Sequence, residues 1–382
     1  MTSPGVFYRP PPSVIDKLGE LNWLLLIALC AVTCVGLAAQ YSVAGGAWSP
    51  WAERHALRFL IGLGMLIAIS VVPLGFWLHL AYPAYAVALG ALLLVPFFGT
   101  EALGARRWLT LGPLSFQPSE LMKVAIVLAM ARYFHVLPRE RASHPLWLLI
   151  PVVMIAAPMI LIIRQPDLGT ALMIGVVGAG LLLMAGVHYL YFLGGIAAVA
   201  AAIPLALPFL HDYQRRRIEV FLDPLSDPLG SGYHVTQSKI AMGSGGVAGK
   251  GFLHGTQSQL DFLPEKHTDF IFTTIAEEWG FVGAVAVLLA FAFLLAILLA
   301  MALTVVSRAG RLLICGTMLS IFVYAAINVG MVSGAIPVVG IPLPFVSYGG
   351  TAMLTLMFGL GLSMSAWVHR NVPVRDEAPL PP

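Results

Sequence analysis

Charged residues are scarce in this chain. Asp, Glu, Lys and Arg make up only 10% of its 382 residues, whereas 59% are hydrophobic and the mean hydropathy is +0.89. A soluble globular domain carries roughly 25% charged residues, so this composition excludes one. Apolar runs of spanning length predict a polytopic membrane protein instead, because helices satisfy their own backbone hydrogen bonds in lipid.

Cysteine is scarcer still. Cys30, Cys34 and Cys315 all lie inside apolar runs, which leaves no disulfide framework and no metal-ligand spacing. The formal net charge of +3 is small and dispersed, so we expect no nucleic-acid partner. The first apolar run, residues 23–39, has no clear small-x-small cleavage site. It is therefore expected to remain as a helix and not to be removed as a signal peptide.

The apolar runs predict an all-α polytopic membrane protein with about ten transmembrane helices. We expect them near residues 22–42, 57–73, 76–98, 118–134, 146–163, 168–186, 189–210, 270–305, 312–332 and 346–367. Lys and Arg are more frequent in the tails and the loops at 135–145 and 306–311 than in the short loops on the other side. This bias predicts that both tails are cytoplasmic.

The predicted organisation has three parts. A cytoplasmic N-terminal tail at 1–21 precedes a ten-helix membrane domain at 22–370, and a cytoplasmic tail follows at 371–382. The membrane domain includes one large extracytoplasmic loop at 211–269, between the seventh and eighth helices.

The window at residues 257–280 collects much of the chain's charge and leads into the eighth predicted helix. From Trp279 to Val306 the apolar run would form about 42 Å of helix against roughly 30 Å of hydrocarbon. Asp269 is therefore expected at or beyond the outer surface, where ionisable groups are often functional. Asp269 also stands where a helix begins. From this stretch alone, capping of that helix is favoured over catalysis.

Glycine is abundant just before this window, in the run VTQSKIAMGSGGVAGKGF. Gly249–Lys250 does not complete a phosphate-binding P-loop, because position 244 is not glycine and position 251 is neither Ser nor Thr. We expect the glycines to permit tight turns and close backbone packing. In a helix, Asp269, Thr273, Ala276 and Gly280 would fall near one face, which is small and polar, so something could approach closely there.

Two further features mark the predicted helix ends. Glu120 and Lys123 open the fourth helix at i, i+3 spacing and can pair on one face, in a structural or a functional role. Trp108, just before them, is typical of an interfacial anchor. Residues 333–350, SGAIPVVGIPLPFVSYGG, are rich in proline and glycine and predict a bent, re-entrant element.

Several of these outward-facing stretches together resemble one family. They are ARRWLTLGPLSFQPSELMK, RQPDLGTA, YQRRRIEVFLDPLSDPLGSGYH, QSKIAMGSGG, LDFLPEKHTDFIF with AEEWG, and PVVGIPLPFVSYGG. Each is similar to a motif of the shape, elongation, division and sporulation (SEDS) proteins, and the match covers residues 20–370. The runs IPLPFVSYGG and LHGTQSQLDFLPEKHTDF resemble the rod-shape members more than the division members.

The resemblance implies a ten-helix peptidoglycan glycosyltransferase that polymerises lipid II outside the bacterial cytoplasmic membrane. It also implies a partner, a class B penicillin-binding transpeptidase. The family's essential acidic residue matches Asp269, which reverses the preference for capping. Its intramembrane pair matches Glu120 and Lys123, and its loop aromatic residue matches Trp108. Arg216 is an extra basic residue in its motif, so only the flanking Arg215 and Arg217 carry over.

The implied reaction assigns three tasks to these residues. Asp269 would be the general base that takes the proton of the attacking sugar hydroxyl. The charge of the polyprenyl pyrophosphate leaving group would be stabilised by basic residues, namely Arg107, Lys123, Arg215 and Arg217. A divalent cation such as Mg²⁺ or Mn²⁺ could share that task, although the sequence offers no complete ligand set. Grooves lined by small residues could hold the lipid tails.

Two other classes of function remain as alternatives. A lipid II flippase or transporter would also contain polar intramembrane pairs and broken helices, but its site is expected near the middle of the bilayer. A non-catalytic scaffold of the cell-wall machinery predicts that Asp269 can be replaced without loss of activity. The clustering of charge at the outer boundary favours chemistry at the surface.

Overall fold

The computed structural model describes residues 13–102, 105–112, 114–206, 215, 219–221, 223, 231–260, 262–263 and 265–371. A helix coincides with each predicted span. In chain order these helices are α2 (Trp23–Val43), α3 (Trp51–Val71), α4 (Leu74–His79) with α5 (Ala81–Phe98), α6 (Pro118–Val136), α7 (Pro145–Ile163), α8 (Leu168–Met184), α9 (Tyr189–Ala206), α13 (Ile271–Thr304), α14 (Arg308–Val332) and α15 (Gly350–Val368).

Seven of the helices in the described residues are long and apolar enough to cross a membrane, namely α2, α3, α5, α7, α13, α14 and α15. Their exposed surface carries large apolar side chains, as in Leu57, Leu60 and Phe293, which suits a lipid-facing belt. The chain is therefore a multi-pass membrane protein, as predicted. The count of ten spans stays a prediction.

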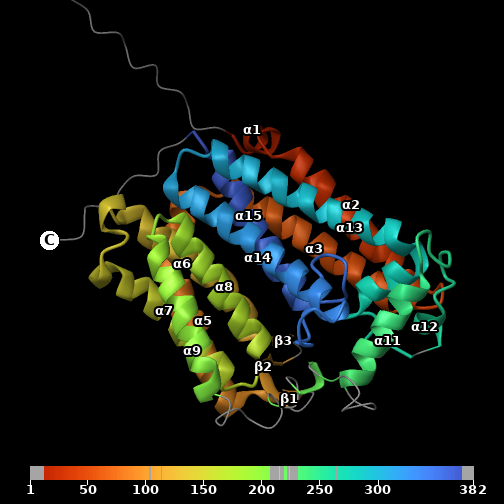
Figure 1. Ribbon diagram of the computed structural model, residues 1–382. Helices are drawn as coiled ribbons and strands as arrows, with labels where there is room; N and C mark the ends of the chain where they lie inside the picture. The colour runs from red at the N-terminus through yellow and green to blue at the C-terminus, as the bar shows by residue number, and fades with distance from the viewer. Residues whose placement is uncertain are drawn as a thin grey trace, which may run out of the picture.

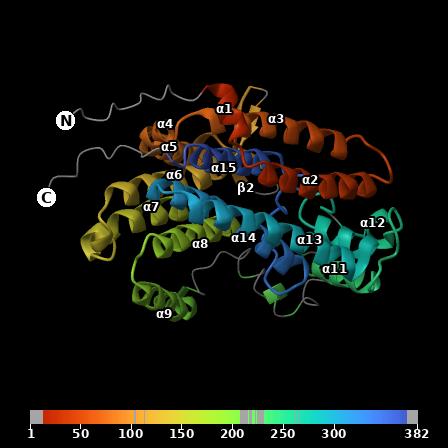
Figure 2. The same cartoon turned by 90° about the horizontal axis from the view of Figure 1, so that it is seen from above.

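Helix α14 joins two groups of helices. It packs against α6 and α8 on one side and against α13 and α15 on the other. Figures 1 and 2 show α5 to α9 gathered on the first side and α2, α3, α13 and α15 on the second. The short helix α1 (Val14–Gly19) lies at one end of the bundle, while α11 (Ser231–Ser244) and α12 (Thr256–Gln259) lie at the other (Figure 1). An ion pair of 2.6 Å between Glu20 and Arg370 brings the two described chain ends to the same side.

A small sheet interrupts the otherwise helical chain. The sequence did not predict this sheet. Strands β1 (Thr100–Ala102), β2 (Ala105–Leu111) and β3 (Leu114–Phe116) pair antiparallel in that order. Leu111 pairs with Leu114 across a two-residue turn in which Gly112 has a φ of +62°, a value that favours glycine. The sheet holds β2, with Arg107 and Trp108, beside the start of α6.

Helix α13 is broken at Gly280, where φ is 66° and ψ is −162°. The glycine-rich segment at residues 245–251, which we call the glycine loop, completes the interrupted hydrogen bonding. The amides of Lys250 and Gly251 donate to the carbonyls of Glu277 and Glu278 at 3.1 and 3.0 Å. In return, the amides of residues 281 and 282 donate to the carbonyls of residues 246 and 247 at 2.9 and 3.1 Å.

The close contact between the glycine loop and α13 requires glycine. A Cβ atom at Gly249 would lie 2.1 Å from the carbonyl oxygen of Glu278, and one at Gly245 would lie 2.2 Å from that of Ala276. The predicted close packing is confirmed, and so is the prediction of a close approach to the face of Ala276. The helix begins at Ile271, however, so Asp269 lies in the turn before α13 and not within it.

The segment at residues 333–349 is irregular and partly buried, which confirms the predicted bent element. Side chains of neighbouring helices satisfy its backbone. Asn328 donates to the carbonyl of Ile341 at 2.7 Å, Gln40 donates to that of Val346 at 3.2 Å, and His55 bonds that of Phe345 at 2.9 Å. Non-helical backbone at membrane depth is stable only where protein buries it and pairs its polar groups, as here.

Candidate active site

A cavity of about 620 Å³ lies where α3, α6, α8, α14 and α15 meet the turn before α13. Five of the residues predicted for the site line it, namely Asp269, Arg107, Trp108, Glu120 and Lys123. They come from three separate elements: the turn before α13, β2, and the first turns of α6. The sequence therefore predicted residues that the fold brings to one cavity.

Two hydrogen bonds made by its own amide and carbonyl hold Asp269 in its turn. Its amide donates to the carbonyl of Glu265 at 3.1 Å, and its carbonyl accepts from Asn328 of α14 at 2.8 Å. The carboxylate lies beside Gly340, where an added Cβ would come within 3.2 Å of Oδ2. The N-cap position of α13 is Phe270, so Asp269 does not take the capping position. A carboxylate at the cavity wall, carried on a turn whose backbone is held in place, is the arrangement that a general base requires.

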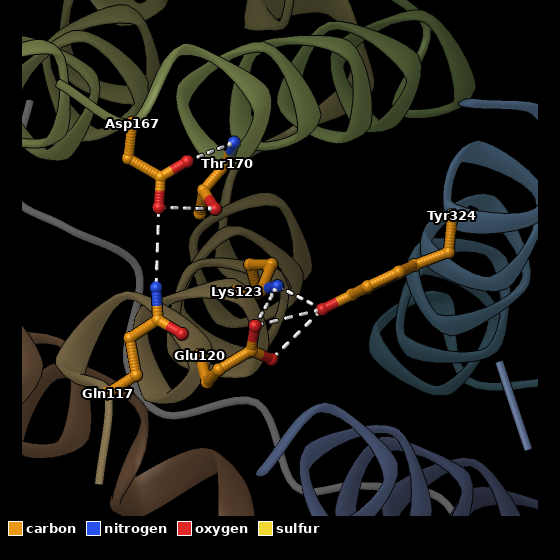
Figure 3. Close-up of polar contacts among 6 residues, drawn as sticks. All are labelled: Gln117, Glu120, Lys123, Asp167, Thr170 and Tyr324. Atoms are coloured by element: carbon orange, nitrogen blue, oxygen red, sulfur yellow. Dashed lines mark hydrogen bonds and ion pairs between the residues drawn. The ribbon is translucent and has the colours of Figure 1, made fainter. Parts of the chain in front are cut away.

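Glu120 and Lys123 form a buried network with Tyr324 of α14 (Figure 3). Lys123 Nζ lies 2.6 Å from Glu120 Oε1, and both residues are 7% exposed. The Tyr324 hydroxyl donates to Glu120 Oε2 at 2.9 Å and also contacts Lys123 Nζ. The predicted i, i+3 pair is confirmed, and its charge is balanced inside the protein.

Asp167 supplies a third carboxylate to the cavity, after Asp269 and Glu120 (Figure 3). It is the N-cap of α8, where its side chain accepts from the amide and the hydroxyl of Thr170 at 3.1 and 3.0 Å. Gln117, at the start of α6, donates to it at 3.3 Å. These bonds fix the carboxylate and join the N-terminal ends of α6 and α8.

Arg107 fastens the sheet to the turn between α7 and α8. Its guanidinium donates to the carbonyls of Gln165 and Pro166 at 3.2 and 2.5 Å. Part of its hydrogen-bonding capacity is therefore already used. Arg107 still lines the cavity, but its first role in this structure is to position β2 with Trp108.

The other two predicted basic residues differ from this group. Arg215 is exposed and pairs with Glu219 at 3.8 Å, and it is not among the residues that line this cavity. Arg217 lies outside the described residues. A role for either in substrate binding stays a prediction.

A cluster of aromatic and basic side chains near Asp269 was missed by the sequence reasoning. The imidazole of His267 stacks on Trp51 of α3, with ring centroids 4.0 Å apart. The amide of Tyr348 donates to the carbonyl of His267 at 2.9 Å, and Arg58 of α3 lies 4.4 Å from the centre of the Tyr348 ring. Arg58, His267 and Tyr348 all line the cavity.

Electrostatics in the cavity depend on which cations are already compensated. Burial lowers the pKa of His267 below its ordinary value, the nearby charge of Glu265 raises it, and that of Lys266 lowers it. Burial dominates and favours the neutral imidazole. Lys123 is compensated by Glu120. Within the part of the chain that the structure describes, no three His, Cys, Asp or Glu residues gather as metal ligands.

Comparisons with known proteins agree with these observations. Residues 18–372 match the cell cycle protein family of FtsW, RodA and SpoVE. The chain is 42% identical over 360 residues to the peptidoglycan glycosyltransferase MrdB of Escherichia coli K12, covering 94% of this chain and 96% of that protein. It is 37% identical over 329 residues to MrdB of Helicobacter pylori, covering 84% of each.

Solved structures show the same similarity. The crystal structure of the Thermus thermophilus rod shape determining protein RodA matches with a TM-score of 0.68 and 28% identity, covering 92% of this chain and 97% of that one. A structure from a peptidoglycan synthase complex that coordinates polymerization and crosslinking matches with a TM-score of 0.79 and 31% identity, covering 92% and 99%. The chain therefore belongs to the FtsW, RodA and SpoVE family of cell cycle proteins, the SEDS family that its motifs resemble.

Proposed function

We propose that this protein is a peptidoglycan glycosyltransferase that polymerises lipid II at the outer face of the bacterial cytoplasmic membrane, for cell elongation and rod shape. The single observation that carries the proposal is the cavity in which Asp269 meets Arg107, Trp108, Glu120 and Lys123. The relatives named peptidoglycan glycosyltransferase MrdB support the reaction class.

In the proposed reaction, a sugar hydroxyl of one lipid-linked disaccharide attacks the anomeric carbon of another. The new bond joins the hydroxyl oxygen to that carbon. The bond from the carbon to the phosphate oxygen breaks, and its electron pair leaves with the polyprenyl pyrophosphate. The hydroxyl proton passes to the Asp269 carboxylate, and a positioned base of this kind contributes roughly 10²- to 10⁴-fold to a rate.

The leaving group explains why one carboxylate can suffice. A pyrophosphate needs no proton to depart, whereas the sugar leaving group of a glycoside hydrolase is protonated by a second carboxylic acid. Basic side chains would stabilise the developing charge instead. Arg107 and Lys123 line the cavity and are our candidates from the sequence, with Arg215 and Arg217 proposed for the adjoining loop. A divalent cation would supply further charge stabilisation there.

We also propose the setting of the reaction. The partner would be a class B penicillin-binding transpeptidase that crosslinks the new strand, as the similarity to a chain of a peptidoglycan synthase complex supports. Both chain termini would lie in the cytoplasm, as the Lys and Arg bias supports. The cavity and the sheet would then face the outside.

The deciding experiment is polymerisation of lipid II by purified protein in detergent, with wild type, Asp269→Asn and Asp269→Glu. The asparagine keeps the size of the side chain but removes the basicity, and the glutamate displaces the carboxylate by one methylene. We expect glycan chains from wild type, none from Asp269→Asn and few or none from Asp269→Glu, with similar melting curves. Normal glycan chains from Asp269→Asn would refute the assignment of the base.

The same assay distinguishes a glycosyltransferase from both alternative functions. Detergent micelles have no two compartments, so a flippase would make no glycan there. A scaffold would make none with any variant, and addition of the transpeptidase partner would not change that.

A further inference from the structure

The cations that line the cavity differ in what they already bind. Lys123 is paired with Glu120, and Arg107 donates to two carbonyls of the turn between α7 and α8. Arg58 is different. Among the described residues it makes no ion pair and no side-chain hydrogen bond, and its recorded contact is the face of the Tyr348 ring. A guanidinium stacked on a ring keeps the N–H groups at its edge available.

Arg58 also has a defined place beside the catalytic turn. Tyr348, on which it stacks, is hydrogen-bonded through its amide to the carbonyl of His267, two residues before Asp269. Gly350 also lies against the guanidinium, since a Cβ atom there would lie 2.9 Å from Cζ and Nε of Arg58. The ring and the glycine therefore both border the guanidinium, on the wall formed by α3 and α15.

The structure thus shows a half-buried guanidinium that has no ion-pair partner within the described part of the chain, facing a large cavity that also contains the Asp269 carboxylate. Charged groups in such a place are normally paired, because burial without a partner costs free energy. The missing partner is an anion that enters with the substrate. Planar guanidinium groups bind phosphate oxygens by two parallel hydrogen bonds, which suits them to a pyrophosphate.

We propose that Arg58 binds the pyrophosphate of the lipid-linked sugar donor on the Asp269 side of the cavity, with Tyr348 and Gly350 fixing the orientation of its guanidinium. This inference rests on the proposed glycosyl transfer and assigns the leaving group a position in the site. The donor's phosphate then lies beside α3 and α15. Lys123, already paired on the α6 wall, is not its first contact.

The test uses the full-length protein in detergent and two readouts. One is polymerisation of lipid II. The other is the rise in melting temperature on addition of polyprenyl pyrophosphate, compared with polyprenyl monophosphate, which needs no turnover. For Arg58→Gln we expect both turnover and affinity for polyprenyl pyrophosphate to fall on the order of 10- to 100-fold, because a charge-assisted hydrogen bond is lost. Arg54→Gln is the matched control, since Arg54 is exposed on the same helix and does not line the cavity.

Gly350→Ala tests the position of the guanidinium without removing it. The new methyl group would overlap the tip of the Arg58 side chain, which can move aside, and alanine is favoured over glycine within a helix. We expect a melting temperature at or above that of wild type, together with weaker binding of polyprenyl pyrophosphate. If Arg58→Gln does not fold, the affinity of Gly350→Ala for polyprenyl pyrophosphate still tests the role of Arg58.

The outcomes separate this inference from the proposed function. Wild-type affinity for polyprenyl pyrophosphate in Gly350→Ala and in any folded Arg58→Gln would overturn the role of Arg58, even if the wild-type protein makes glycan. Absence of glycan from the wild type would instead count against the proposed function, while the melting shift still reports on Arg58.

Discussion

The hydroxyl of Tyr324 on α14 donates a hydrogen bond of 2.9 Å to Glu120 on α6, and so joins two helices through residues that are 204 positions apart in the chain. This bond lies at the junction between the two groups of helices that α14 connects. Lys123 contacts both residues, so the three side chains act as one buried polar unit. Such a unit is stable only when every member keeps its partner.

Breaking this unit should be costly. Glu120→Ala leaves the Lys123 ammonium buried and unpaired, and we expect a loss of about 3–5 kcal/mol in the free energy of unfolding. Tyr324→Phe removes one hydroxyl and should cost about 1–2 kcal/mol. Tyr85→Phe is the control, because this substitution also removes a hydroxyl, whose hydrogen bond to the carbonyl of Met154 lies away from the cavity.

Denaturation in detergent and polymerisation of lipid II measure the two effects. If the unit only holds helices together, activity should follow stability in both tyrosine variants. If it also contacts substrate, Tyr324→Phe should lose more activity than Tyr85→Phe at equal stability. Wild-type stability of Glu120→Ala would contradict the buried pair.

The contact between the glycine loop and α13 predicts a sharp contrast between two glycines. Gly249→Ala would bring a methyl group to 2.1 Å from the carbonyl oxygen of Glu278, at a φ of +81°, and should destabilise by more than about 2 kcal/mol. Gly243→Ala lies in α11 with open space around it and should be neutral or stabilising. Melting curves of the two variants check this. Equal curves would disprove the close packing.

The buried carboxylate of Glu277 depends on Lys250. Their side chains meet at 2.7 Å, with Glu277 fully buried and Lys250 partly exposed. Lys250→Met should lower stability by about 1–3 kcal/mol, because it leaves a buried acceptor without its charged donor. Glu277→Gln in the same chain should restore part of that loss. A double-mutant cycle measures the coupling, and strictly additive effects would argue against the pair.

Stability should depend on pH through His267. Its pKa is lowered in the folded protein, mainly by burial, so the unfolded chain binds the proton more readily. The stabilisation is therefore complete above the unfolded pKa of about 6.5 and is lost as pH falls below it towards the folded pKa. We expect the melting temperature of wild type to fall more steeply below pH 6.5 than that of His267→Gln.

Cysteine labelling tests the orientation in the membrane. In a background without Cys30, Cys34 and Cys315, Ala248→Cys in the glycine loop should react with an impermeant reagent in intact cells. Val306→Cys, exposed between α13 and α14, should react only after the cells are opened. Reaction of both from outside would reject the proposed arrangement.

Much of this structure follows from local patterns in the sequence. Apolar runs predicted every helix of the membrane region, and the spacing of Glu120 and Lys123 predicted their pair. The motif resemblance brought Asp269 into the site. These signals are local or are tied to a family motif, so a single sequence can carry them.

The remaining features depend on contacts between distant segments. Arg58 and Tyr324 have no local motif that marks them, and they reach the cavity only because α3, α14 and α15 pack together. The break at Gly280 was also missed, because a glycine within an apolar helix is common and only the glycine loop 30 or so residues earlier completes its hydrogen bonds. The small sheet was not predicted because its strands are very short.

The break at Gly280 separates two mechanical demands on α13. The lipid-embedded length after Gly280 must adjust its tilt when the hydrocarbon layer becomes thinner or thicker. In a continuous helix, a change in tilt would also displace the end of the helix that lies before residue 280. In this protein the glycine loop is hydrogen-bonded to the turns before Gly280. The positive φ of Gly280 interrupts the regular hydrogen bonding of the helix at that point. Changes in membrane thickness can therefore be absorbed at this joint, and the turn that carries Asp269 keeps its alignment with the opposite wall of the cavity.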